Sequence, residues 1–152
     1  MAESVLVTGL GHLQSDPQLI YGLGLTYTLQ GNMLKAHQTF EDGLKLVESK
    51  LRANPRIGAD YADAALFRAR LGNKKQAINA LLQSTRLDSE GEDILMKAAR
   101  TYAILGKKPE MLEWFKHAKS LNVEFDAAYL STALDFEKYR TDADLLSIAR
   151  QE

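Results

Sequence analysis

Apolar residues along this chain recur every three to four positions, which is the spacing of one face of an α-helix. A clear example runs through Leu34, Phe40, Leu44, Val47 and Leu51. No stretch shows sustained two-residue alternation between turn signals, so no β-sheet is expected. The pattern therefore predicts an all-α chain.

Proline and glycine divide this helical pattern into segments. The three prolines, at positions 17, 55 and 109, each fall where a helix would begin, and glycines at 31, 72 and 106 each follow a long helical pattern. Proline suits the first turn of a helix, and glycine suits the position just after its last turn. This arrangement predicts short helices joined by tight turns.

The segments around these glycines repeat. From Gly72 to Gly106 is 34 residues, and from Gly31 to Gly72 is 41, which is seven more. Residues at equal offsets from each glycine match in size: small at Gly24, Ala65 and Ala99; apolar at Ala36, Ala77 and Met111; large at Phe40, Leu81 and Phe115; small at Gly43, Ser84 and Ala118. Each unit is predicted to be two antiparallel helices whose small residues allow close approach, and such units bury their apolar faces by stacking.

The spacing and pattern resemble the tetratricopeptide repeat (TPR) family, whose unit is a 34-residue helix–turn–helix. The match is close at Leu23, Gly24, Tyr27, Ala36 and Phe40, and Tyr102, Phe115 and Ala118 support the third repeat. The second repeat departs, with Arg68 where the family usually has tyrosine and Leu81 in place of an aromatic residue. The resemblance implies a right-handed α-solenoid, a TPR-like superhelix of about three full repeats.

The expected organisation is one TPR-like domain over residues 1–152. The seven extra residues predict an elongated second helix that ends near Ala53. The segments are a partial repeat helix (3–15), repeat 1 (17–54), repeat 2 (58–90), repeat 3 (92–123) and capping helices (126–152). "ESVLVTGLGHLQ", residues 3–14, resembles the start of a dinucleotide-binding fold, but G-x-G-x-x-G would need glycine where Gln14 stands, and no βαβ unit follows.

The C-terminal part is expected to close the array. A helix should run from an N-cap at Asp126 through Tyr139, and a shorter one should follow an N-cap at Thr141. "ALDFEKYRTDADLLSIA" also resembles tails that close bacterial TPR arrays attached to signalling kinases or transcription regulators. The chain is accordingly expected to be the C-terminal array of a larger bacterial regulator or kinase, or a self-contained array with caps.

Composition narrows the class of partner. The chain is 45% hydrophobic with a formal net charge of −1 and no cysteine. Near-neutrality disfavours nucleic acid and anionic membranes, both of which attract a concentrated positive field. No apolar run approaches the roughly 20 residues of a membrane span, and no signal peptide is evident. A cytoplasmic location is the default, a periplasmic one stays open, and homo-oligomerisation is possible.

Catalytic and cofactor chemistry is not indicated. His12, His37 and His117 are too scattered for a metal site, and each is expected to be a partly exposed helix residue. Ser84 is expected to pack, not to act as a nucleophile, and Trp114 to be partly exposed. We therefore expect no enzyme, no metal and no cofactor.

By resemblance, the first helix of each repeat lines a groove that binds a peptide or helix of a partner. The groove residues expected here are Gln18, Tyr21, Leu25, Thr28, Leu29, Ala62, Leu66, Ala69, Arg70, Asp93, Met96, Arg100 and Ile104, with Ala59 and Ala103 beside them. This surface suits an apolar or amphipathic segment, with a carboxylate for Arg70 or Arg100. Tyr21 and Leu25 replace the lysine–asparagine set with which some TPRs hold chaperone tails, so that function is rejected.

The leading hypothesis is a protein–protein interaction module or scaffold. The alternatives are an RNA-binding helical-repeat protein, which would need a basic groove, and a structural spacer in a longer regulatory protein. A groove that holds another part of the same chain is a further possibility.

Overall fold

The computed structural model describes residues 15–150. Within this range all regular structure is helical and no strand occurs. The helix expected over residues 3–15 and the side chain of His12 lie outside the described residues, apart from Ser15 at the end of that helix.

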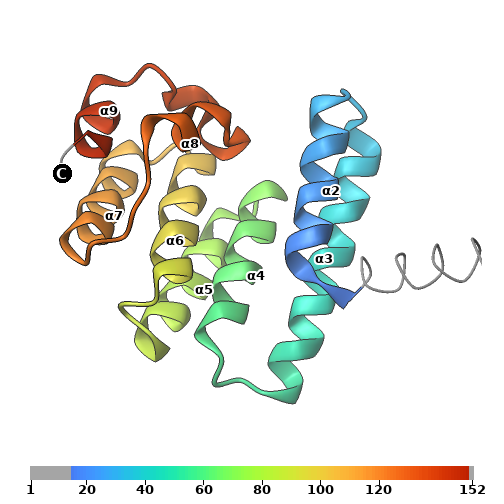
Figure 1. Cartoon of the computed structure of the whole chain (residues 1–152). Coiled ribbons are helices and arrows are strands. Elements are labelled where there is room, and N and C mark those ends of the chain that lie inside the picture. Colours follow the sequence, from blue (N-terminus) through green and yellow to red (C-terminus); the bar gives the residue numbers. More distant parts are fainter. Residues whose placement is uncertain (1–14, 151–152) are drawn as a thin grey trace, which may run out of the picture.

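Three helical hairpins follow one another along the chain (Figure 1). They are α2 (Pro17–Leu29) with α3 (Met33–Ala53), α4 (Gly58–Arg70) with α5 (Lys74–Leu87), and α6 (Glu92–Ile104) with α7 (Lys108–Ser120). The partners within each hairpin pack against each other, and α4 also packs on α3 and α6. The prediction of an all-helical chain built from adjacent helix pairs is confirmed for the described residues.

The three hairpin turns have the same structure. Gly31, Gly72 and Gly106 have φ values of 72°, 80° and 72°, a left-handed conformation that costs glycine little. In the first turn the Asn32 amide donates to the Tyr27 carbonyl over 2.9 Å, and the other two turns repeat this bond. These are helix C-terminal caps of the kind that the glycine spacing predicted.

The proline prediction holds in two cases out of three. Pro17 and Pro109 lie in the first turns of α2 and α7. Pro55 lies in the turn before α4, which begins only at Gly58. Gly58 is buried, with the Ser84 carbonyl close to where a side chain would project, so packing against α5 sets the start of α4.

The elongated second helix of the first hairpin is confirmed. Helix α3 has 21 residues and ends at Ala53, a length of about 31 Å at about 1.5 Å per residue. Gly24 lies directly against the Phe40 ring, and Gly43 against the Phe67 ring, so a Cβ at either glycine would overlap an aromatic ring. The matched small and large positions are therefore packing contacts between helices.

The C-terminal part differs from the prediction. One helix was expected from Asp126 to Tyr139, but α8 (Ala127–Thr132) ends at Thr132. The next residue, Ala133, is extended with a ψ of 120°, and a 3₁₀-helix, η1 (Leu134–Tyr139), follows. The bend buries Leu130, Asp135 and Phe136 together, which a straight helix would not do.

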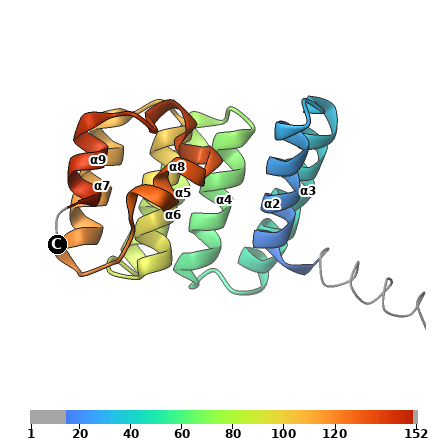
Figure 2. The ribbon, with the colours of Figure 1, turned by 45° about the horizontal axis from the view of Figure 1, so that its top comes forward.

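Thr141 was predicted to be the N-cap of the last helix, but Asp142 caps α9 (Ala143–Ala149) instead. The Asp142 carboxylate accepts from the amides of Asp144 and Leu145 and is held by Lys108 at 2.6 Å. Asp126 caps α8 as predicted. The α8–η1 segment lies in front of α4 and α6 in Figure 2, while α9 packs on α7.

Candidate functional site

One buried carboxylate receives hydrogen bonds from three different hairpins. Asp135 of η1 accepts at Oδ1 from the Tyr21 hydroxyl (2.7 Å) and from Arg70 Nη2, and at Oδ2 from Arg100 Nε (2.7 Å). Tyr21, Arg70 and Arg100 belong to α2, α4 and α6. We call the surface formed by these three residues and their helices the α2/α4/α6 face.

Neighbouring aromatic groups hold these donors in place. The Tyr21 ring lies 5.6 Å from the Phe40 ring and 5.5 Å from the Phe67 ring, centroid to centroid. The Arg100 guanidinium lies over the Tyr21 ring at 5.1 Å, and Arg70 Nε donates to the Tyr21 hydroxyl over 3.1 Å. The site is therefore a connected network in which each donor also contacts another donor.

The charges in this network are strongly coupled. Burial alone would raise the pKa of Asp135, but Arg100 and Arg70 hold it below its usual value. Burial and the adjacent Asp135 carboxylate raise the pKa of the Tyr21 hydroxyl. Burial opposes the charged form of Arg100, yet the Asp135 carboxylate raises its pKa. Two guanidinium groups thus share one carboxylate, and the site keeps a net positive charge.

A second polar cluster lies on the same face, nearer the start of the helices. Lys97 is buried, and its ammonium lies 2.6 Å from carboxylate oxygens of both Asp63 and Asp93. The Gln18 amide donates to Asp63 over 2.7 Å. Burial raises the pKa of Asp63 despite the opposing effect of Lys97. This cluster links α2, α4 and α6 without leaving a free ionic group.

The structure brings some of the predicted groove residues together and buries others. Tyr21, Arg70 and Arg100 meet at Asp135, and Gln18 and Asp93 join the Lys97 cluster. The remainder vary in exposure: Ala62, Leu66, Ala69 and Ala103 are buried; Leu25, Thr28, Ala59, Met96 and Ile104 are half-buried; Leu29 is exposed. The buried residues cannot contact a partner directly in this arrangement.

Sequence reasoning missed Asp135, Asp63 and Lys97. Asp135 stands in "LDF" between apolar residues of the C-terminal segment, and Lys97 stands among the apolar and small residues of α6. A charged residue inside an apolar stripe is a signal for a buried ion pair, although it does not name the partner.

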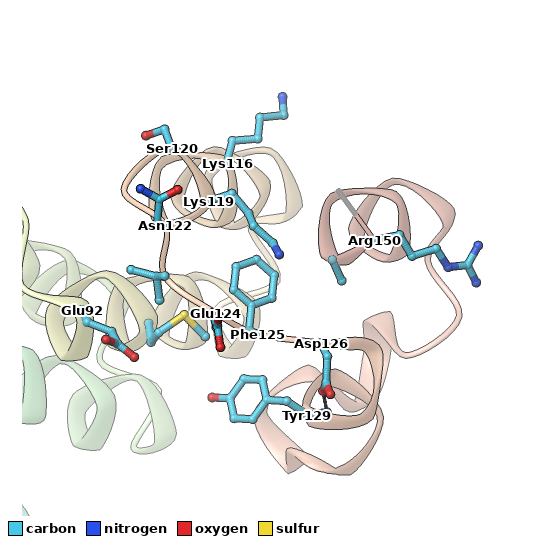
Figure 3. A pocket seen from close by; sticks show the side chains of 13 residues that line it. Glu92, Lys116, Lys119, Ser120, Asn122, Glu124, Phe125, Asp126, Tyr129 and Arg150 are labelled. Carbon is cyan, nitrogen blue, oxygen red and sulfur yellow. Dashed lines mark hydrogen bonds between the residues drawn. The ribbon is translucent and has the colours of Figure 1, made fainter. Parts of the chain in front are cut away.

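An open pocket of about 1220 Å³ lies beside this site, between α6, the end of α7, the 121–126 loop, α8 and α9 (Figure 3). Met96, one of the predicted groove residues, lines it with Phe125 and Tyr129. Acidic residues such as Glu124 and basic ones such as Lys119 both line it, and the Lys119 ammonium lies 4.9 Å from the Phe125 ring centroid. The pocket therefore has no dominant charge.

Other expectations can be compared directly with the structure. Ser84 is buried and donates to the Gly58 carbonyl over 2.8 Å, which confirms its packing role. Trp114 is half-buried, while His37 and His117 are exposed. Among residues 15–150, no group of three or more acidic or histidine side chains could hold a metal ion. No helix in that range is both long and apolar enough to cross a membrane.

No protein-family model matches the chain, and a search of curated proteins found no significant match.

Proposed function

We propose that this chain is a protein–protein interaction module of the TPR-like, α-solenoid type, and that its α2/α4/α6 face binds a segment of a partner protein. The main observation behind the proposal is that Tyr21, Arg70 and Arg100 all donate hydrogen bonds to the Asp135 carboxylate. Three successive hairpins contribute one donor each, so the face recognises a single short segment through the relative placement of its repeats.

The packing between helices supports the assignment to this type of module. Gly24 against Phe40 is a small-to-large contact of the kind that the TPR resemblance implies, and Gly43 lies against Phe67 of the next hairpin. Equivalent turns at Gly31, Gly72 and Gly106 support a repeated unit. The face itself supplies hydrogen-bond donors and no nucleophile–base pair, which favours binding over catalysis.

A peptide-display selection on the full chain tests this function. Binders selected on the wild type would be counter-selected on Arg70→Gln/Arg100→Gln. The matched control is Lys45→Gln/Lys75→Gln, which removes the same charge from exposed positions on α3 and α5. We expect binders that are retained by the control and lost by the face variant. Binders that ignore both changes, or an absence of binders, would contradict the proposal.

One observation favours a second candidate, a structural spacer. The α8–η1 segment already covers the donors of the face, as self-capped arrays require. If the chain is a spacer, Arg70→Gln/Arg100→Gln would lower the free energy of unfolding, and no selected peptide would depend on the two arginines. The display selection therefore separates the two candidates.

A further inference from the structure

We propose that the α2/α4/α6 face recognises a short segment in which an acidic residue directly precedes an aromatic one, and that residues 127–139 of this chain occupy the site until such a partner displaces them. This inference rests on the proposed function and specifies the chemistry of the partner. The docked segment, with Asp135 followed by Phe136, shows which groups the site accepts.

The donor arrangement selects a carboxylate. Oδ1 of Asp135 accepts from Tyr21 and Arg70, and Oδ2 accepts from Arg100, so both oxygens face donors. A carboxamide in this position would turn its own N–H groups toward at least one of these donors. The site therefore discriminates aspartate or glutamate from asparagine or glutamine.

The charge balance also demands an acid. Within residues 15–150, Asp135 is the acidic residue that pairs with both Arg70 and Arg100. A partner without a carboxylate would displace Asp135 and cover two guanidinium groups that have no counter-ion. Covering an unpaired charge is costly, so such partners are excluded.

The next residue supplies an apolar anchor. Phe136 is fully buried, and its ring centroid lies 5.2 Å from that of Phe115 on α7, the helix that pairs with α6. Successive side chains of a 3₁₀-helix point about 120° apart. The carboxylate and the ring therefore enter different parts of the site, and their order along the partner fixes its direction.

The occupying segment is short enough to be released as a unit. Helix α8 and η1 have six residues each, and helices shorter than about 12 residues are marginal in water without tertiary contacts. Tethering makes the segment a strong competitor through its high effective concentration. The apparent affinity for a partner equals the intrinsic affinity multiplied by the fraction of molecules in which the site is free, so an occupied site weakens binding.

The test uses a labelled synthetic peptide with the sequence of residues 126–140, and the same peptide with asparagine in place of the aspartate. Both are titrated against the full-length wild type, Asp135→Asn, and the control Glu137→Gln, which removes an exposed acid from the same turn of η1. We expect Asp135→Asn to bind the acidic peptide at least about tenfold more tightly than the wild type, since the competitor is weakened. The control should behave as the wild type does.

Two further results are required. The asparagine peptide should bind Asp135→Asn at least about tenfold more weakly than the acidic one, and adding Arg100→Gln to the receptor should remove binding. Equal binding of the two peptides would overturn the proposal. If the display selection yields face-dependent binders that lack an acidic–aromatic pair, the proposed function survives and this inference fails.

Hydrogen exchange distinguishes a displaceable segment from a permanent cap. In Asp135→Asn, or in Asp135→Asn/Phe136→Ala if the single change leaves the segment docked, amides of 127–139 should exchange faster while those of α4 and α6 stay protected. Loss of protection throughout α6 and α7 would mean that the segment is an integral part of the fold. That result would overturn the proposal.

Discussion

The Tyr21 hydroxyl donates a 2.7 Å hydrogen bond to Oδ1 of Asp135, although the two residues are 114 positions apart in the sequence. This contact joins the first described helix to the 3₁₀-helix near the C-terminus, across the intervening hairpins. Because Tyr21 also packs on Phe40 and Phe67, the polar contact is continuous with the core of the first two hairpins. Docking of the C-terminal segment and packing of the hairpins should therefore be energetically coupled.

Tyr21→Phe isolates the polar part of this coupling, because the aromatic ring and its packing are kept. The change removes a donor to a buried carboxylate and an acceptor for Arg70, so we expect a loss of about 1.5–3 kcal/mol in the free energy of unfolding. Chemical denaturation followed by circular dichroism measures it. Tyr27→Phe, at a half-buried tyrosine outside the network, is the control and should change stability by less than about 0.5 kcal/mol.

Gly24→Ala tests the contact between α2 and α3. The new methyl group would overlap the Phe40 ring, so we expect destabilisation of about 1–3 kcal/mol by thermal or chemical unfolding. Gly22→Ala is the matched control on the same helix, where no atom lies within 4 Å of the added Cβ. It should stabilise by up to about 1 kcal/mol through helix propensity. Equal effects of the two substitutions would show that the glycine–phenylalanine contact is unimportant.

Lys97→Met removes the counter-ion of buried Asp63. The paired side chains are almost inaccessible, and the uncompensated carboxylate should cost about 3–5 kcal/mol. Asp63→Asn in the same chain should restore much of this loss, because the remaining amide is neutral. A double-mutant cycle by denaturant unfolding gives the coupling energy, and additive effects would contradict a direct Asp63–Lys97 interaction.

Asp135 should also make stability depend on pH in the acid range. Its pKa is lowered in the folded protein relative to the usual 3.8, so its contribution is fully present above the unfolded value and is lost as pH falls through the folded one. The difference in unfolding free energy between wild type and Asp135→Asn should be constant from pH 7 to about 5 and should shrink below 3.8.

Equilibrium unfolding at a series of pH values checks this dependence. Glu137→Gln, at an exposed acid two positions away, serves as the control for a general effect of charge. A gap between wild type and Asp135→Asn that widens in acid would show that the carboxylate is not stabilised by the two arginines.

The local rules of helix formation made most of the hairpins predictable. Glycine can take a left-handed conformation cheaply, so the turns at Gly31, Gly72 and Gly106 could be placed from spacing alone. The length of α3 followed from the continuation of the apolar period to Leu51. Repeated small and large positions, such as Gly24 and Phe40, indicated how each pair of helices would pack.

Only the arginine side of the candidate site was predicted from the sequence, and its carboxylate, Asp135, was not. The resemblance to TPR arrays placed Arg70 and Arg100 on one groove-lining face, and a carboxylate partner was expected for one or the other of them. The source of that carboxylate depended on a break in helix at Ala133, where no glycine or proline marks the change. The apolar contacts of Leu130 and Phe136, not local propensity, favour the bend.

For residues 15–150, the sequence by itself determined the helical structure, the positions of the three hairpins and the residues that pack within them, because these features depend on neighbours a few positions apart. The tertiary structure alone decided that Asp135 would meet Tyr21, Arg70 and Arg100 across separations of 114, 65 and 35 residues. Such an arrangement is set by the summed packing of several elements and by the need to pair every buried charge, and neither is encoded in a local pattern.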